Sequence, residues 1–485
     1  MARELLLVAP RFMRIDRPYL PYLLVGAAIL ARTSPSSAQT KEPADIPAPP
    51  LSATARSMSL GEAVAYARVH QPAIRAALSR VTERMAQAKV PSGQWLPTVA
   101  VTAQIYGMTA NNTSATYLAT PFMDVPRIGG TAQVVPGSAN LAPYASTLVG
   151  AGVTQELFDF GRIGAQRAAL DELVNVESHR SDVERLNIDF GVEEAYFSVL
   201  AAKAIVRASD EAYDRSKVHR DLAQRGVDSG LRPPIELTRS EADLARFDVD
   251  RVRSRGGLAV AQTVLGAAIG APELSIDTAV DSPQPSDMPS LNEALQRAQA
   301  RDPAIAAAIA DLRAAEQHTR AVGAELRPDL SLTGTLSGRA GGAGGAPPSG
   351  DGWIPSVPNW DVGAIFSWPL FNGVIDARRN AAQTVEQVRH DEIDIARDQL
   401  IARVRRTFEQ VQVSRSAIAA LQSQVVAARA NYAQADARFG AGIGNAVELA
   451  DAEAVRTDAD IQLAIGQFDL ARDRAAFGRA IAEGL

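Results

Sequence analysis

The chain has 485 residues, enough for two or three ordinary domains, and 46% of them are hydrophobic, which excludes a wholly disordered protein. Aromatic residues make up only 5%, a composition that suits thin, closely packed helices better than a thick globular core. The absence of cysteine excludes disulfides, thiolate metal sites and a lipid-carrying N-terminal cysteine. The net charge of −6 argues against a nucleic-acid partner.

Residues 1–38 are predicted to be a signal peptide. Arg11, Arg14 and Arg17 precede an apolar run from Tyr19 to Ala31, and small residues up to Ala38 offer a cleavage site. The alternative is an uncleaved anchor, but the run is shorter than the roughly 20 residues that a spanning helix needs. Beyond it, no uninterrupted apolar stretch approaches that length, so we expect any membrane role to use strands.

After this leader the sequence contains the same pattern twice. Ser59-Leu60-Gly61-Glu62-Ala63 returns as Ser290-Leu291-Asn292-Glu293-Ala294, and Leu157-Phe158-Asp159-Phe160-Gly161 returns as Leu370-Phe371-Asn372-Gly373. Each copy spans about 200 residues, which is too long for a solenoid repeat, so the copies indicate one folding unit that was duplicated and fused. We expect a first repeat at 39–270, a linker at 271–289 and a second repeat at 290–485.

Each copy is predicted to contain a helix, two strands and two further helices. The first helices, 59–94 and 290–326, begin with Ser-Leu-x-Glu, in which the serine can cap the helix and the glutamate completes a capping box. Strands are predicted from strict alternation of apolar and polar residues at 97–106, 147–157, 328–338 and 360–370. Segments of about ten alternating residues are typical of membrane β-barrels.

Two features accompany these strands. Trp360 and Trp368 lie on one face, where they could be aromatic residues of a membrane interface or ordinary sandwich core. The loops between paired strands, 107–146 and 338–358, are rich in glycine, proline and small polar residues. Long loops on one side only are what outer-membrane barrels place outside the cell, which favours the barrel.

The remaining segments are unusually long helices, predicted at 160–225, 234–270, 373–439 and 446–482. A helix of about 65 residues spans on the order of 100 Å, wider than any single-domain core. Apolar residues at alternating spacings of three and four, such as Val411, Ile418, Leu421 and Val425, indicate a coiled-coil seam. We expect each opening helix to stack end to end with the short last helix of its repeat, so that together they cover the long one.

Four strands of about ten residues cannot close a barrel, and lipid does not tolerate open sheet edges, so the chains are expected to associate. Two chains give eight strands, whose interior fills with side chains, whereas three give twelve, wide enough for water. The predicted fold is therefore helical plus a membrane β-barrel. Three chains would form a 12-stranded barrel, four strands each, continued by a coiled-coil helical tunnel.

The ordered set of duplicated motifs resembles the TolC family of outer-membrane efflux and secretion channels over essentially the whole mature chain. The matching features are the Ser-Leu-x-Glu-Ala openings, the later Pro-Ala-Ile, the Leu-Phe-Asp/Asn returns and the two Gly-x-x-x-x-x-Glu-Leu turns. The resemblance implies a homotrimer in the lipid of a Gram-negative outer membrane, with a large periplasmic tunnel. The tunnel would dock onto a periplasmic adaptor (membrane fusion protein) linked to an inner-membrane pump or ABC exporter, and residues 39–58 and 271–289 would form a belt around its middle.

The same resemblance implies a gate and docking tips near the turns between the long and short helices. Acidic residues at the tunnel entrance would be Glu448 and Asp451, with Glu236 in the first copy; a ring of carboxylates in a narrow pore favours cations. The alternative is that these residues are solvated groups at helix N-termini. Gly444 stands where the best-known member has a basic residue, and Arg232, Arg239 or Arg438 could substitute for it. The adaptor-docking tips would contain Gly226, Gly230, Gly440, Gly442 and Gly444, which equally permit simple helix reversal.

The sequence does not predict an enzyme, a cofactor or a metal site, because its five histidines lie far apart on helical segments. The favoured function is the exit duct of a tripartite efflux system for drugs, metals or other toxic compounds. Two alternatives stay open: the duct of a type I protein secretion system, and a periplasmic structural coiled coil without a pore.

Overall fold

The computed structural model describes residues 56–108, 118–120, 123–125, 144–279, 288–340 and 358–483, which belong to one compact unit. The expected signal peptide, most of the expected belt segment 39–58, and most of the residues of the two long loops lie outside this description.

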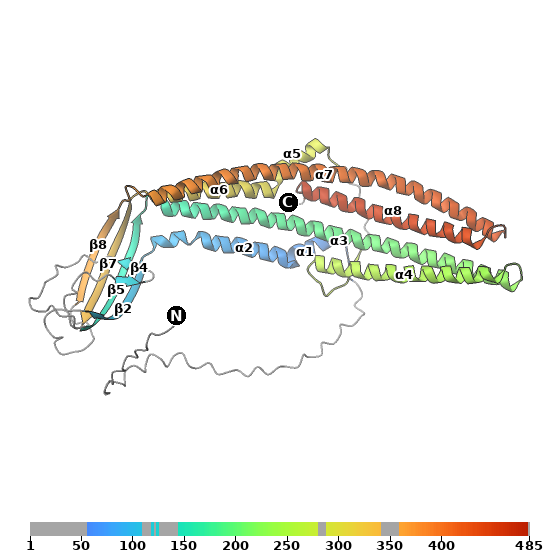
Figure 1. Cartoon of the computed structure of the whole chain (residues 1–485), viewed down its shortest axis with the longest axis horizontal. Helices are drawn as coiled ribbons and strands as arrows, with labels where there is room; N and C mark the ends of the chain where they lie inside the picture. Colours follow the sequence, from blue (N-terminus) through green and yellow to red (C-terminus); the bar gives the residue numbers. More distant parts are fainter. Residues whose placement is uncertain are drawn as a thin grey trace, which may run out of the picture. The chain divides into compact units, whose positions relative to one another are not determined.

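The larger elements, two opening helices, two long strands, a long helix and a shorter helix, repeat in the same order in the two copies (Figure 1). The first copy contains β1 (Arg56–Met58), α1 (Leu60–His70), α2 (Pro72–Ala88), the 3₁₀ helix η1 (Pro91–Trp95), β2 (Thr98–Met108), β3 (Leu118–Thr120), β4 (Met123–Val125), β5 (Tyr144–Phe158), α3 (Arg162–Asp228), α4 (Pro234–Ala268) and β6 (Ile276–Thr278). The second contains α5 (Leu291–Arg301), α6 (Pro303–Ala324), β7 (Asp329–Ala340), β8 (Pro358–Ser367), α7 (Gly373–Gly440) and α8 (Ala446–Ala480).

Each opening helix is divided in two, where the sequence predicted one continuous helix (59–94 and 290–326). The breaks fall at Gln71 and Asp302, whose backbones are extended (ψ 121° and 117°) because the ring of a following proline disfavours the helical conformation. Each proline then takes the first position of the next helix, where its missing N–H is not needed. Both predicted capping boxes are present, at the starts of α1 and α5.

Two shorter helices lie end to end along each long helix. The helices α2 and α4 pack along α3, and α6 and α8 pack along α7 (Figure 1). At the junction of α4 with α2, Gln71 Nε2 donates to the carbonyl oxygen of Ala268 at 2.8 Å. Gly270 adopts a φ of +84°, and a Cβ there would lie 3.0 Å from the His70 backbone, so the close approach needs glycine.

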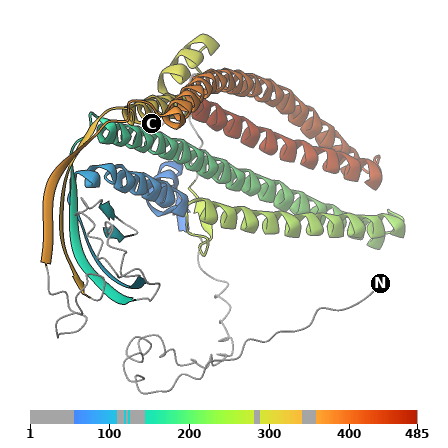
Figure 2. The same cartoon turned by 60° about the vertical axis from the view of Figure 1, so that its left-hand side comes forward.

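The two copies meet through α3, which packs against both α6 and α8, so that α2 and α4 form one edge of the helical layer and α7 the other (Figure 2). The predicted seam of α7 is buried at Val411, Val425, Ala428, Tyr432, Ala435 and Phe439. Beside this layer β1 and β6, each of which lies within one of the expected belt segments, pair in parallel. No helix in the described part of the chain is long and apolar enough to cross a membrane.

The four longer strands form one antiparallel sheet in the order β2-β5-β7-β8. The register aligns Val99, Val153, Gly334 and Val362 in one row and thereby assigns every strand residue to a face. Exposed apolar residues share one face: Val99, Val101, Val149, Val153, Leu332, Leu336, Trp360, Val362 and Phe366. The opposite face carries Thr98, Thr102, Thr154, Ser331, Thr333, Thr335, Ser337 and Asp361. The sheet therefore has one exposed apolar face and one polar face, as the alternation predicted.

Asp302 stabilises the start of α6 in two ways. Its Oδ1 accepts hydrogen bonds from the backbone N–H groups of Ala304 and Ile305 at 2.9 and 3.1 Å, and its Oδ2 lies 2.6 Å from Arg403 Nη2 on α7. The residue is 8% exposed, so these bonds lie in a poorly hydrated site.

We predict a graded loss of stability at this position. Asp302→Asn keeps the helix cap but loses the charge pair, and Asp302→Ala loses both, at a cost of about 2–3 kcal/mol for the alanine variant. Circular dichroism melting of the detergent-purified protein should rank wild type above Asn and Asn above Ala. Equal melting temperatures for all three would show that neither contact stabilises the fold.

Candidate functional site

The end of the helical layer away from the sheet is formed by two turns, one between α3 and α4 and one between α7 and α8 (Figure 1). Each helix ends before a glycine in the left-handed region, Gly230 with φ +72° and Gly442 with φ +76°. A Cβ would meet no atom at either position, so glycine is required there by backbone conformation and not by space.

The two turns differ by a reciprocal exchange of arginine and glycine. Because α4 begins at Pro234 and α8 at Ala446, equivalent positions of the two turns lie 212 residues apart. Arg232 is therefore equivalent to Gly444, and Gly226 to Arg438. In the first turn a Cβ on Gly226 would lie 2.6 Å from Arg232 Cδ, so this glycine leaves the space that the arginine side chain fills. In the second turn a Cβ on Gly444 would lie 2.9 Å from the backbone nitrogen of Phe439, so this glycine lets the turn approach the backbone at the end of α7.

Both arginines pair with equivalent carboxylates. Arg232 Nη1 lies 2.8 Å from Glu236 Oε2, and Arg438 Nη1 lies 2.9 Å from Glu448 Oε1. The first pair is largely buried, with side chains 16% and 18% exposed, whereas the second is 55% and 39% exposed and therefore more screened by water. Of the three arginines considered as substitutes for a basic residue at position 444, Arg438 is the one that pairs with Glu448.

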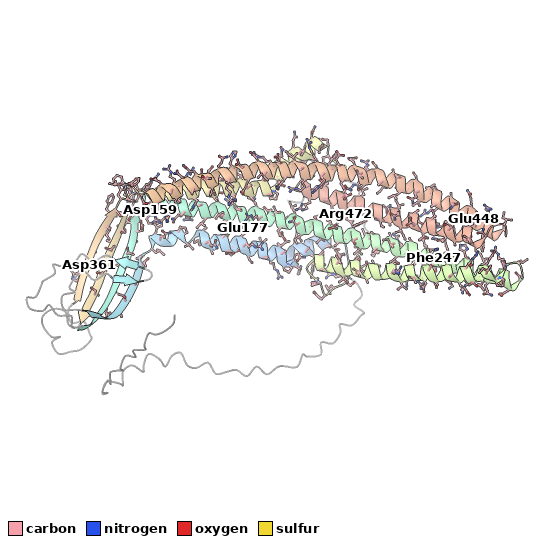
Figure 3. The ribbon with its side chains drawn as sticks, in the orientation of Figure 1. Asp159, Glu177, Phe247, Asp361, Glu448 and Arg472 are labelled. Atoms are coloured by element: carbon pink, nitrogen blue, oxygen red, sulfur yellow. The ribbon has the colours of Figure 1, made fainter. Side chains whose placement is uncertain are left out.

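The other predicted gate residues lie nearby on the short helices. The side chain of Asn445 caps α8 by accepting from the backbone N–H of Glu448 at 2.7 Å, which places Glu448 in the first turn of the helix (Figure 3). Asp451 follows one turn later and is exposed, with no ion pair to any described residue of the chain. Arg239, at the equivalent position of α4, is exposed as well.

A polar cluster that the sequence analysis missed joins the two copies just above the turns. Arg215 of α3 donates from Nε to both carboxylate oxygens of Glu453 on α8, at 2.9 and 3.1 Å. His219 Nε2 lies 2.9 Å from Tyr432 Oη on α7. Glu453 is 1% exposed and interrupts a buried stripe of small residues on α8. A carboxylate within such an apolar stripe is the feature of the sequence that could have indicated this cluster.

Burial sets the protonation of this cluster. Removal from water lowers the pKa of His219, opposed by the neighbouring carboxylates Asp436 and Glu453. Burial, reinforced by Glu453, raises the pKa of Tyr432 to about 12. At neutral pH a neutral imidazole therefore faces a neutral phenol, beside the buried Arg215–Glu453 pair.

The predicted interface tryptophans lie at the sheet. Trp360 is on the apolar face of β8, opposite Leu336, and is 75% exposed. Trp368 is 55% exposed but lies just beyond the strand, because β8 ends at Ser367, and Pro369, which lacks an N–H, follows. Asp361 marks the sheet and Glu448 the turn region in Figure 3.

A cavity of about 650 Å³ lies between α3 and α8 at mid-height. Phe190, Phe197 and Phe468 line it together with the carboxylate of Glu193. Burial raises the pKa of Glu193 to about 7, reinforced by the negative charges of Asp189 and Glu483. No cluster of His, Cys, Asp and Glu that could hold a metal ion occurs among the residues that the structure describes.

We predict that Glu193 makes the fold less stable as the pH rises. Because the pKa of Glu193 is raised to about 7, the folded protein keeps a proton on this residue that the unfolded chain releases near pH 4.5. The contribution of Glu193 to the free energy of unfolding is therefore fully present below pH 4.5 and is lost as the pH rises to about 7. Glu193→Gln should therefore raise the melting temperature at pH 8 and change it little at pH 4. The exposed Glu409→Gln serves as control, and an equal effect of Glu193→Gln at both pH values would contradict the assignment.

The comparisons agree with this architecture. The structure is similar to the Campylobacter jejuni CmeC outer membrane channel (TM-score 0.66, 17% identity, 88% of this chain and 86% of that chain). It is also similar to the open state of the Neisseria gonorrhoeae MtrE outer membrane channel (0.63, 19%, 88% and 89%) and to the Vibrio cholerae outer membrane protein VceC (0.64, 16%, 87% and 96%). The sequence has no significant match among the curated proteins.

A family model decides the assignment. The model described as "Outer membrane efflux protein" matches residues 64–271 and 294–482, one stretch within each copy of the duplicated unit. The chain therefore belongs to the outer membrane efflux protein family.

Proposed function

We propose that three copies of this chain form the exit duct of a tripartite efflux system, which passes small molecules from an inner-membrane pump and a periplasmic adaptor to the exterior. The observation that carries the proposal is the four-stranded sheet, with one exposed apolar face, one polar face and an unpaired edge at β2 and at β8. Such a sheet suits lipid only when its edges pair with other chains, and twelve strands enclose a water-filled lumen lined by the polar face.

The helical turns are the proposed adaptor contacts. Leu231 and Ile443, which occupy equivalent positions in the two turns, are 85% and 74% exposed. Apolar side chains at the tips of both hairpins offer a docking surface that would repeat around the ring, beside the tip glycines Gly226, Gly230, Gly440, Gly442 and Gly444.

The family description favours efflux over the alternative, a type I secretion duct. The second alternative, a structural coiled coil without a pore, gives no reason for the apolar face of the sheet. Glu448 and Asp451 are proposed to form the acidic ring of the entrance, with Glu236 contributing less because Arg232 neutralises it in a buried pair.

We predict that the purified protein produces small, cation-selective steps of single-channel conductance in planar lipid bilayers. Glu448→Ala combined with Asp451→Ala removes two carboxylates per chain and leaves Arg438 unpaired, so the steps should enlarge or lose their preference for cations. Asp458→Ala removes an exposed carboxylate farther along α8 and should change neither property.

The outcomes separate the two claims. Unchanged steps in the double variant would keep the pore and refute the gate. If the wild-type protein shows no conductance, the duct is refuted and the structural coiled coil without a pore becomes the favoured function.

A further inference from the structure

The cavity between α3 and α8 has the size and the wall of a small-molecule site. Its volume of about 650 Å³ falls within the range of about 300–1,000 Å³ that is typical of such sites. Phe190 and Phe197 of α3 and Phe468 of α8 contribute aromatic rings to the wall, and Leu186 and Ile418 add aliphatic surface. A cavity with this wall favours a ligand that carries aromatic or alkyl groups.

One carboxylate in the same wall has no partner. Glu193 follows Phe190 by three residues and precedes Phe197 by four, so the three side chains share one face of α3. Glu193 is half-buried and makes no hydrogen bond or ion pair with any residue that the structure describes. A carboxylate withdrawn from water without a counter-charge is costly, and a cation placed beside it would remove that cost.

The charges around Glu193 favour a cation. After burial, the charges that most affect its pKa are the carboxylates of Asp189 and Glu483, which raise it, and Arg68, which lowers it. Arg68 is already bonded to Asp189, with its Nε and Nη2 at 3.0 and 2.6 Å from the two carboxylate oxygens. The potential at Glu193 is therefore negative.

The other charged groups of the wall are three arginines. Arg479 is held by Asn187, since its Nε donates to the side-chain oxygen at 2.8 Å. Arg207 is exposed, and Arg474 lies half-buried on α8. None of these three is among the groups that set the pKa of Glu193.

The residues that shape the cavity occur in one copy of the duplicated unit only. Val192 and Val404, both 0% exposed, show that α3 and α7 keep the offset of 212 residues at this level. At that offset the three phenylalanines and Glu193 are replaced, in chain order, by Ala402, Glu409, Gly256 and Arg405. The cavity is therefore not a by-product of the repeated helix packing.

We propose that this cavity binds an amphipathic organic cation. The apolar part of the ligand packs among Phe190, Phe197 and Phe468, whose ring faces also attract positive charge, and the cationic group pairs with the Glu193 carboxylate. All of the lining residues belong to one chain, so the inference goes beyond the proposed duct and does not depend on the number of chains in the ring.

The test uses ethidium, an aromatic cation whose charge does not change with pH and whose fluorescence rises when it leaves water. It is titrated into the detergent-purified protein, with protein-free micelles as the blank. The affinity should increase about tenfold from pH 6 to pH 8, because a carboxyl group with a pKa of about 7 changes from about one-tenth to about nine-tenths ionised over that range.

Two variants locate the binding. Glu193→Gln keeps the size of the side chain without its charge, so it should weaken binding at pH 8 about tenfold and remove the pH dependence. Ala471→Phe fills the cavity from α8 and should abolish binding at both pH values. The controls Glu409→Gln and Ala430→Phe change exposed residues of α7 and should bind ethidium as the wild type does. Melting temperatures establish that each variant is folded.

Ethidium binding that neither Glu193→Gln nor Ala471→Phe weakens would overturn the proposal. The same holds if binding is lost only in the double variant Glu448→Ala, Asp451→Ala, because the probe would then occupy the tunnel entrance. Tighter binding of the anionic probe 8-anilinonaphthalene-1-sulfonate, abolished by Ala471→Phe, would contradict the charge of the ligand.

The conductance experiment keeps this inference separate from the proposed duct. A protein that conducts but does not bind ethidium contradicts the cation site alone. A protein that binds ethidium in the cavity but does not conduct contradicts the duct alone.

Discussion

The fold depends on one constraint: in lipid, every backbone N–H and C=O group must find a partner within protein. A sheet of four strands has two unpaired edges, β2 and β8, and its apolar face is unsuited to water. The single chain is therefore incomplete as a membrane element: its open edges are paired when equal sheets join edge to edge, and its apolar face is covered by lipid. The long hairpins of α3 with α4 and of α7 with α8 have their turns at the end of the helical layer away from the sheet, and in the proposed ring they would continue the barrel as a helical tube.

Duplication supplies two hairpins per chain, and the differences between them carry the specific chemistry. The arginine belongs to the loop in the first turn (Arg232) and to the long helix in the second (Arg438), and each pairs with the equivalent glutamate, in a largely buried pair in the first turn and an exposed pair in the second. Only Arg232 also reaches the other copy, through the Phe439 carbonyl. Of the two turns, the first is therefore the one whose arginine is bonded to the other copy.

Much of this architecture could be predicted from the sequence, because its signals are local. Alternation identified the strands and their faces, and serine–glutamate pairs identified the capping boxes of α1 and α5. The helix breaks at Gln71 and Asp302 also have a local signal, because a proline follows each of them. They were not predicted because the helical pattern continues on both sides of each proline. The end of β8 before Trp368 also precedes a proline, but there the cause is that Pro369 has no N–H to donate to the strand ladder.

The buried ion pair between Arg215 and Glu453 could not be predicted in the same way. The two residues are 238 positions apart, and their pairing depends on the register between α3 and α8, which no local pattern specifies. The gate assignments for Glu448, Asp451 and Glu236 came from a family resemblance, and they stay predictions until a pore is measured. What the structure adds is which of these carboxylates is already neutralised within the chain.

The most direct test of the account is the mass of the detergent-purified complex by native mass spectrometry, because the open sheet edges require chains to associate and the width of the barrel favours three of them over two. The account predicts three copies of the mature chain. A stable monomer would contradict it, since four strands would then have to satisfy their own edges, and a dimer would give an eight-stranded barrel too narrow for a duct.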